Sequence, residues 1–208
     1  MKILITGFEP FGENSLNPSQ MLVESLSDNE RDEVSLIKEV LPVDQAKALE
    51  RVVSLIDQHH PDAILAFGLA INRPKISLER VALNLRDFRI PDNKGVTVTD
   101  QPIQSKGPAA YFSTLPLQEM LKALQTQGIP AELSLSAGAY LCNLVFYTIM
   151  HTLSRHPSSV PAGFVHLPAL PEQAGDGVRP IPSLSFELQL SAAEIMVNIL
   201  SEGQHTNI

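Results

Sequence analysis

The sequence predicts an α/β fold, a three-layer α/β/α sandwich around a mixed, mostly parallel twisted sheet. Apolar runs of strand length alternate with segments in which apolar residues recur at helical spacing. The helical segments are long enough to connect parallel strands and to cover both faces of a sheet. No repeat, low-complexity tract or linker interrupts this alternation, so we expect residues 1–208 to form a single domain.

The chain is expected to open with a buried strand at 2–8, KILITGF. A short helix follows at 17–26, where Asn17 can be the N-cap and Pro18 the first helical residue. A second strand is predicted within 33–43, EVSLIKEVLPV.

A second helix is expected after Asp44, a plausible cap, because apolar residues recur at helical spacing at Leu49, Val52, Val53 and Ile56. The run DAILAFG at 62–68 predicts a third buried strand. Residues 75–95 read as a mixed, partly extended segment that ends in a Pro/Asn/Gly turn.

The second half of the chain continues the alternation with a helix over 117–128 that Gly128 closes, and a strand within 131–138. A helix is then expected from about 140 to 155, followed by a strand in 163–171. The last helix carries one apolar face, formed by Leu188, Ala192, Ile195 and Ile199.

Composition narrows the function classes. The formal net charge of −8 argues against nucleic acid or an anionic membrane as the main partner. A single cysteine excludes an internal disulfide and a Cys-rich zinc site, and a free thiol favours a reducing compartment. The N-terminal MKILITGFEPFG does not read as a signal peptide, and the apolar stretch 139–153 is shorter than the roughly 20 residues of a membrane span. We therefore expect a cytoplasmic protein.

Ligands of parallel α/β sheets bind at the carboxyl ends of the strands. The loops after LITGF, ILAFG, LSLSAG and GFVHLP are therefore the places where a site is expected. Cys142 follows LSLSAG closely and falls in the first turn of a predicted helix, where free N–H groups and the helix dipole favour a thiolate. This position suits a nucleophile, although a free cysteine is often a small buried apolar residue.

A nucleophilic thiol needs a general base, and the sequence offers six histidines. His166 ends the strand GFVHLP, which would place it at the same rim as Cys142; the alternative is a packed strand histidine. The other five are excluded as the base: His59 and His60 look solvated, His205 lies in a polar tail, and His151 and His156 follow Cys142 on one helix that carries them away from the sulfur.

The third member of such a site should be an acid that orients the imidazole. The candidates near the rim are Glu9, Glu79, Asp87, Asp92 and Glu172. Glu79 stands among apolar residues, which suggests burial and the need for a partner; the alternative is an ion pair with Arg80 or another arginine. The residues alone leave the choice between Glu79 and Asp87 open.

The motifs TGFEPFGENSLNPS, ERVALNLRDFRIPDN, YFSTLP, SAGAYLCN and FVHLPALPEQ occur along essentially the whole chain. In this order they resemble pyroglutamyl peptidase I, a family of cysteine peptidases also called pyrrolidone-carboxylate peptidases. The resemblance implies removal of an N-terminal 5-oxoproline from peptides. It also implies a cytosolic homo-oligomer, a dimer or tetramer, and no metal or organic cofactor.

The resemblance assigns roles to residues. It implies a triad of Cys142, His166 and Glu79, since Glu79 occupies the position of the acid in the motif ER-x-A-x-N. It also implies a lactam pocket formed by Phe8, Phe11, Asn17, Tyr140 and Leu141, with Arg89 near the nucleophile.

Each pocket role has a structural alternative. Phe8 and Phe11 could be core aromatic residues, and the side chain of Asn17 could be occupied as a helix cap. Arg89, a possible oxyanion donor, could instead pair with Asp87 or Asp92.

One segment departs from the family pattern. Where the family commonly reads G-x-A-G-G-R, this chain reads GLAINR, with Ile71 and Asn72 in place of two glycines. Glycine tolerates backbone angles that isoleucine does not, so the loop before Glu79 is expected to differ in shape.

A catalytically weak homologue that binds pyroglutamyl peptides is the alternative function. A nucleoside phosphorylase or nucleotide hydrolase is disfavoured because the chain lacks a P-loop and a GxGxxG after a strand.

Overall fold

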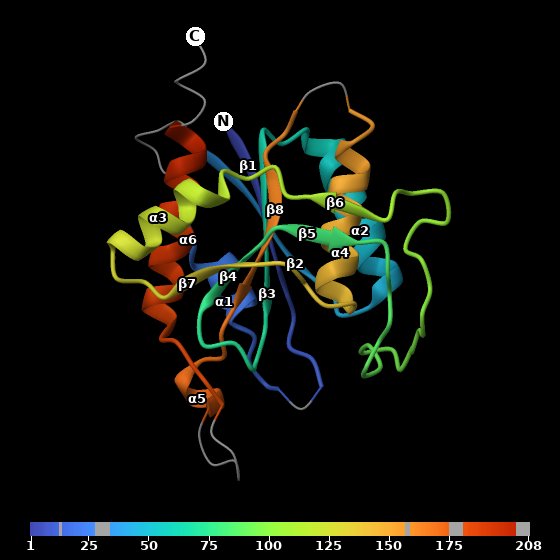
Figure 1. Cartoon of the computed structure of the whole chain (residues 1–208), viewed down its shortest axis with the longest axis horizontal. Helices are drawn as coiled ribbons and strands as arrows, with labels where there is room; N and C mark the ends of the chain where they lie inside the picture. Colours follow the sequence, from blue (N-terminus) through green and yellow to red (C-terminus); the bar gives the residue numbers. More distant parts are fainter. Residues whose placement is uncertain (13, 28–33, 157–158, 175–180, 203–208) are drawn as a thin grey trace.

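The computed structural model describes the chain except for residues 13, 28–33, 157–158, 175–180 and 203–208. Its main sheet is six-stranded and mixed (Figure 1). In spatial order the strands are β2 (Ser35–Leu41), β1 (Lys2–Phe8), β3 (Ala63–Leu69), β8 (Ala162–Leu167), β4 (Ile76–Glu79) and β7 (Ala131–Ser134).

Neighbouring strands of this sheet pair in parallel except at β4, which runs antiparallel to β8. Because β7 is parallel to β4, its carboxyl end does not lie at the same edge as those of β1, β3 and β8. The expectation of one shared rim is therefore wrong for β7. The segment 135–140 carries the chain from the end of β7 to the start of the next helix.

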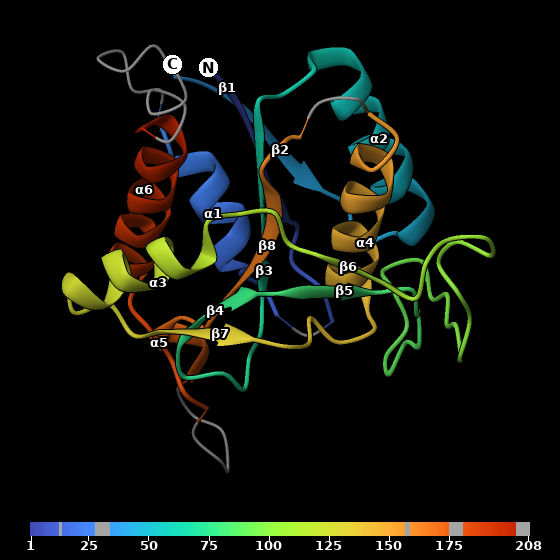
Figure 2. The same ribbon diagram turned by 45° about the horizontal axis from the view of Figure 1, so that its top comes forward.

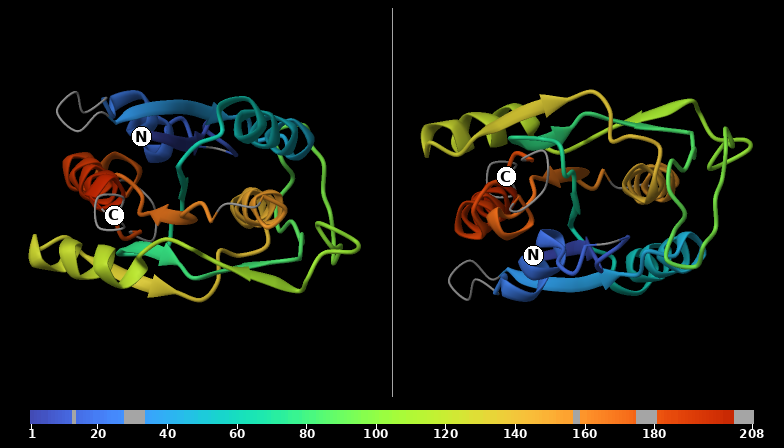
Figure 3. Two further views of the ribbon diagram at one scale, coloured as in Figure 1. Left: turned by 90° about the horizontal axis from the view of Figure 1, so that it is seen from above. Right: turned by 90° about the horizontal axis from the view of Figure 1, so that it is seen from below.

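Helices cover both faces of the sheet, as Figure 2 and the end views of Figure 3 show. On one face lie α1 (Pro18–Ser25), α3 (Leu117–Thr126) and α6 (Phe186–Glu202). On the other lie α2 (Gln45–His59) and α4 (Leu141–Leu153), and the short α5 (Pro171–Ala174) follows β8. The predicted three-layer α/β/α architecture is confirmed.

The helix starts follow the predicted capping chemistry. Asn17 Oδ1 accepts a hydrogen bond from the Ser19 N–H, and Pro18 is the first residue of α1. Asp44 Oδ1 accepts from the N–H groups of Ala46 and Lys47 at the start of α2. Both caps satisfy donors that a helix start leaves without partners.

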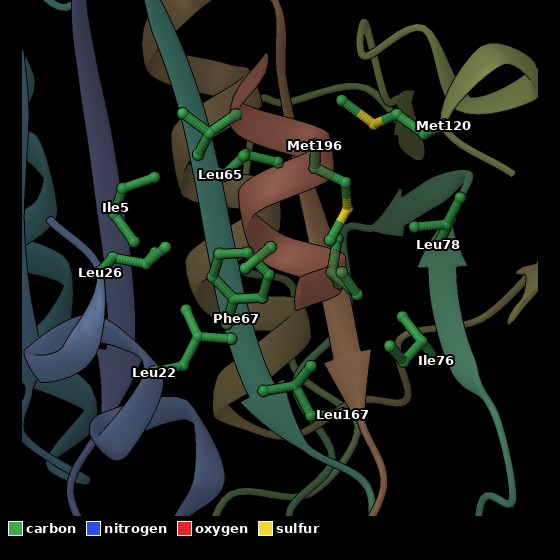
Figure 4. Packing of buried hydrophobic residues seen from close by; sticks show 14 of the residues in the cluster. Ile5, Leu22, Leu26, Leu65, Phe67, Ile76, Leu78, Met120, Leu167 and Met196 are labelled. Carbon is green, nitrogen blue, oxygen red and sulfur yellow. The ribbon is translucent and has the colours of Figure 1, made fainter. Parts of the chain in front are cut away.

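Strands β1, β3 and β8 are almost wholly buried because helices cover both faces. Alternate side chains of β8 therefore enter different cores. Val165 and Leu167 pack with α1, α3 and α6, whereas Phe164 packs with α2 and α4. Figure 4 shows Leu167 in the first of these cores. His166 shares the face of Phe164, so its imidazole lies on the α4 side of the sheet.

Two elements differ from the sequence expectation. The strand β6 (Ala110–Phe112), which was not predicted, pairs antiparallel with β5 (Val81–Leu83) to form a separate two-stranded ribbon. In α6 the predicted apolar stripe coincides in part with the buried face. Ala192 is buried and Ile195 and Ile199 pack against the core, but Leu188 is exposed. The buried face also includes Gln189, Ala193 and Met196. This face is buried because α6 packs against α1 and α3 as well as the sheet. Among the described residues, no helix has the length and apolar character to cross a membrane.

Candidate active site

A cavity of about 890 Å³ opens beside the carboxyl ends of β1, β3 and β8. Its walls come from the loops after β1 and β3, the segment 137–140, residues 87–91 and the start of α4. The structure brings together there all of the predicted pocket residues and two of the predicted triad: Phe8, Phe11, Asn17, Arg89, Tyr140, Leu141, Cys142 and His166. Glu79 lies behind the wall, against His166.

Cys142 is the second residue of α4, and its side chain is half-buried. No side chain caps this helix start, so its first N–H groups are left without a capping partner. The sulfur lies over Gly68 of β3: a Cβ at that glycine would come within 2.8 Å of it. Gly68 is paired in register with His166 of the adjacent strand, and such strands lie roughly 4.8 Å apart. The sulfur of Cys142 therefore lies over β3, on the same face of the sheet as the imidazole of His166 on the adjacent strand β8.

The surroundings of Cys142 favour the neutral thiol over the thiolate. Burial raises its pKa to about 12, and the negative charge of Glu79 acts in the same direction. Arg73 and the Cys142 backbone N–H oppose this shift without overcoming it. The helix start favours the thiolate as expected, but desolvation acts against it and has the larger effect on the pKa.

His166 donates a hydrogen bond from Nδ1 to Oε1 of Glu79, with the two atoms 2.7 Å apart. A carboxylate accepts only, so the neutral imidazole carries its hydrogen on Nδ1 and its lone pair on Nε2. Burial lowers the pKa of His166 below its ordinary value, against the opposing effect of Glu79. The imidazole is therefore neutral and able to accept a proton near neutral pH.

Glu79 is fully buried, and a buried carboxylate is stable only with partners. Burial acts to raise its pKa, but the hydrogen bonds from His166 and Ser134 and the charge of Arg73 lower it overall. The arginine paired with Glu79 is Arg73 rather than Arg80. Glu79 is thus ionised beneath the imidazole.

The other four candidate acids have different surroundings. Glu9 Oε1 accepts from the Val43 N–H and from Asn93. Asp92 accepts from the backbone N–H groups of Lys94, Val96 and Gln45, and so closes a turn. Asp87 is exposed at the cavity, and Glu172 is exposed on α5. Glu79, and not Asp87, is therefore the acid that is hydrogen-bonded to His166. The sequence alone left this choice open.

The aromatic residues of the cavity differ in burial. Phe8 is 3% exposed and belongs to the core beneath α2 and α4, so it is both a core residue and a wall of the cavity. Phe11 is half-buried, with its ring centroid 6.2 Å from that of Tyr140. Tyr140 packs edge-on against Phe88, and its hydroxyl donates to the Pro91 carbonyl over 3.1 Å. These contacts fix an apolar wall next to Cys142.

Most of the hydrogen-bonding capacity of Asn17 is used inside the protein. Its Oδ1 accepts from both the N–H and the hydroxyl of Ser19, and its Nδ2 donates to the Glu9 carbonyl. An amide nitrogen has two hydrogens, so one remains to donate. Asn17 can therefore give one hydrogen bond to a ligand carbonyl but accept none.

Arg89 lines the cavity with an exposed side chain. Within the part of the chain that the structure describes, it forms no ion pair with Asp87 or Asp92. Its guanidinium is thus available at the mouth of the cavity.

Ile71 and Asn72 occupy a turn that the Arg73 N–H closes by donating to the Ala70 carbonyl. Among the described residues, the non-glycine residues with positive φ are His60 and Asp100. The turn therefore does not need glycine at either position, and both side chains line the cavity.

Among the described residues, the other histidines do not line this cavity. The ring of His151 is hydrogen-bonded to Tyr111 and Arg155, beside the two-stranded ribbon. His59 ends α2 and is half-buried, and His60 is exposed, while His205 lies outside the described residues.

A family model described as pyroglutamyl peptidase matches residues 1–203. The chain belongs to the pyroglutamyl peptidase family. The family predicted from the motifs is thereby confirmed, and with it the assignment to the cysteine-type peptidases.

Relatives and solved structures of the pyroglutamyl peptidase family match almost the whole of this chain. The pyrrolidone-carboxylate peptidase of Vibrio vulnificus (strain CMCP6) is 45% identical over 196 residues, covering 94% of this chain and 91% of the relative. That of Yersinia pestis (strain Pestoides F) is 42% identical over 204 residues, covering 98% and 94%.

A mutant pyrrolidone carboxyl peptidase from Pyrococcus furiosus superposes with a TM-score of 0.94 at 39% identity, covering 98% of this chain and 99% of that one. Pyroglutamyl peptidase I of Bacillus amyloliquefaciens superposes with a TM-score of 0.91 at 37% identity, and the match covers 97% of each chain.

Sequence reasoning missed two residues of this pyroglutamyl peptidase site. Arg73 occupies the arginine position of the family motif G-x-A-G-G-R. Sequence reasoning considered only the two glycine positions of this motif and not its charged residue. Gly68 ends the apolar run ILAFG, and nothing in that run shows that the sulfur of Cys142 fills the space beside it.

Proposed function

We propose that this member of the pyroglutamyl peptidase family removes the N-terminal pyroglutamyl residue of peptides, with Cys142 as nucleophile, His166 as general base and acid, and Glu79 as the group that orients His166. Family membership supports the reaction. The observation that carries the residue assignment is the hydrogen bond from His166 Nδ1 to Glu79, because it leaves Nε2 as the proton acceptor in a cavity shared with the chain's single cysteine.

The first step starts from a neutral thiol and a neutral imidazole. His166 Nε2 takes the S–H proton while the sulfur forms a bond to the carbonyl carbon of the pyroglutamyl residue. The electron pair of the carbonyl double bond moves onto its oxygen. Glu79 stabilises the imidazolium that forms and stays ionised itself.

The oxyanion needs hydrogen-bond donors that are in place before the reaction. The start of α4 supports such a site because its first N–H groups have no side-chain cap and lie beside the cavity. The Cys142 N–H is the nearest of these to the sulfur. Arg89 is a second donor candidate at the cavity mouth.

Collapse of the tetrahedral intermediate breaks the C–N bond. The His166 imidazolium gives its proton to the departing amine, which leaves a thioester on Cys142. A water molecule then gives a proton to His166 and attacks the thioester, and the thiolate recovers that proton as the pyroglutamate is released. The neutral resting state is restored.

The lactam cap is neutral and flat, which suits the apolar wall of Phe8, Phe11, Tyr140 and Leu141. The remaining N–H of Asn17 can donate to the lactam carbonyl. Proline lacks that carbonyl and would leave the donor unpaired, at a cost of about 1–3 kcal/mol. We expect the site to reject prolyl peptides for this reason.

A fluorogenic pyroglutamyl amide tests the proposal. Wild-type protein should release the fluorophore, and iodoacetamide or the substitution Cys142→Ser should abolish the release. The matched prolyl amide should be cleaved about 5- to 150-fold more slowly, as the lost hydrogen bond predicts. Binding of a pyroglutamyl peptide without turnover at any pH would contradict the proposal and indicate a binding module.

We also propose that the protein acts in the cytoplasm as a homodimer or homotetramer. A lone free thiol favours a reducing compartment. Light scattering during size-exclusion chromatography tests the assembly, and a monomeric mass would contradict it.

A further inference from the structure

The guanidinium of Arg73 connects two parts of the site that are distant in sequence. Its Nη1 donates to Oε1 of Glu79 and to the Ser134 hydroxyl, the latter over 3.2 Å. Its Nη2 donates to the Ser136 carbonyl over 2.7 Å. The planar guanidinium presents several donors in fixed directions, which a lysine cannot reproduce.

These hydrogen bonds hold both Glu79 and the segment 135–140, which leads to Cys142. Glu79 lies beneath His166, and residues 135–140 lead directly into α4 and Cys142. Ser136 also accepts from the Gly138 N–H through its hydroxyl, so the bond from Arg73 reaches a segment with its own internal order. Movement of Arg73 would therefore disturb the acid and the nucleophile together.

Arg73 also helps to keep Glu79 ionised at rest, together with the hydrogen bond from His166. The carboxylate is fully buried, and His166 is neutral, so the imidazole supplies no compensating charge. Oε1 is shared by Arg73 and His166, and Oε2 has no hydrogen-bond partner among the described residues. The guanidinium is the cation that stabilises this carboxylate before the reaction begins.

We propose that Arg73 is a positioning residue that neutralises Glu79, so that His166 can stay an unprotonated base, and that fixes the segment presenting Cys142. This inference rests on the proposed function. Arg73 therefore has two separable contributions, its charge and the geometry of its donors.

Two substitutions separate these contributions. Arg73→Gln removes the charge, so Glu79 would draw a proton onto His166, and the acidic limb of the pH profile of kcat/KM should move to higher pH. Arg73→Lys keeps the charge but loses the fixed donors. It should leave the acidic limb in place and lower kcat/KM by about 10- to 100-fold, the usual result of a small misplacement in a site.

The control is Arg80→Gln, which removes an exposed arginine next to Glu79 in sequence. Circular dichroism melting verifies that each variant is folded, and iodoacetamide alkylation reports on Cys142 alone because the chain has one cysteine. Alkylation of the Arg73→Gln variant should need a higher pH than that of wild type, since Arg73 lowers the thiol pKa.

The outcomes are distinct. A limb shifted only in Arg73→Gln, with reduced kcat/KM in Arg73→Lys, supports the inference. An unshifted limb in Arg73→Gln, whether the rate is unchanged or uniformly lower, overturns it. If Arg73→Gln does not fold, an Arg73→Lys variant with wild-type kcat/KM overturns the positioning role. Wild-type and Arg80→Gln proteins without turnover would instead refute the proposed function.

Discussion

Gly68 and His166 are in-register partners on the adjacent strands β3 and β8, and the missing side chain of the glycine provides the space for the sulfur of Cys142. A Cβ at Gly68 would lie 2.8 Å from that sulfur and 2.8 Å from Cζ of Phe164. Real Cβ atoms do not approach other heavy atoms so closely. The site thus depends on a glycine inside a buried strand.

Gly68→Ala is therefore expected to displace the sulfur from the imidazole. Crowding in a packed core costs about 1–3 kcal/mol of unfolding free energy. A shift of about 1 Å in a reacting group costs roughly 100-fold in rate, so kcat/KM should fall by at least that factor while the protein stays folded. Denaturant unfolding and steady-state kinetics measure the two effects.

Gly163→Ala is the matched control. It crowds Ser113 and Leu115 on the opposite face of β8, away from the sulfur. It should reduce stability similarly but leave kcat/KM of the folded protein near wild type. Equal kinetic losses in both variants would argue against a specific role for Gly68.

Glu79→Gln removes the negative charge that stabilises the His166 imidazolium and replaces an acceptor by an amide. We expect kcat/KM to fall by about 100- to 10,000-fold, as for the corresponding acid in other triads, with the fold retained. Glu132→Gln, on the neighbouring strand β7, should have little effect because its exposed carboxylate has only long contacts, 3.9 Å to Lys75 and 3.4 Å to the Ser77 hydroxyl, and the amide oxygen of glutamine can still accept from that hydroxyl. Wild-type turnover of Glu79→Gln would contradict an orienting role for Glu79.

The pH profile should show a neutral resting pair. His166 has a pKa below its ordinary value of roughly 6.5, so it remains a base at neutral pH, and kcat/KM should fall only as the pH decreases below about 6.5. The thiol pKa of about 12 means that iodoacetamide alkylation should be slow at pH 7 and rise steadily up to pH 10. A rate of alkylation that is constant from pH 6 to 9 would indicate a thiolate–imidazolium pair instead.

The two phenylalanines of the first loop should respond differently to truncation. Phe8→Ala removes a buried core ring and should cost about 3–5 kcal/mol of stability. Phe11→Ala affects a half-buried ring at the cavity, so it should raise KM for a pyroglutamyl amide several-fold with a small change in stability. Thermal melting and saturation kinetics distinguish the two, and equal destabilisation would contradict the difference in role.

The sequence predicted the elements whose signals are local. The caps Asn17 and Asp44, the buried strand at 2–8 and the helix that begins beside Cys142 were all predicted within a few residues. They depend on hydrogen bonds and apolar periodicity within one segment. The face of α6 was predicted only in part, because its burial also depends on α1 and α3, which lie far away in sequence.

The long-range features of the site could not be predicted from local patterns. The antiparallel direction of β4, which brings Glu79 to His166, follows from strand order and leaves no mark in ISLE. The raised thiol pKa follows from the burial that surrounds a helix start, while the helix start alone predicts the opposite. Arg73 is the arginine of the segment GLAINR, but its partners on β4 and after β7 come close to it only when the sheet is assembled.

The contact between Glu79 and His166 joins residues separated by 87 positions and requires β4 to insert beside β8 in the direction opposite to the other central strands. Pairings of such long range are slow to form. In a refolding time course, recovery of turnover should therefore lag behind the helical circular dichroism signal, and enzymatic activity would serve as a clock for completion of the sheet.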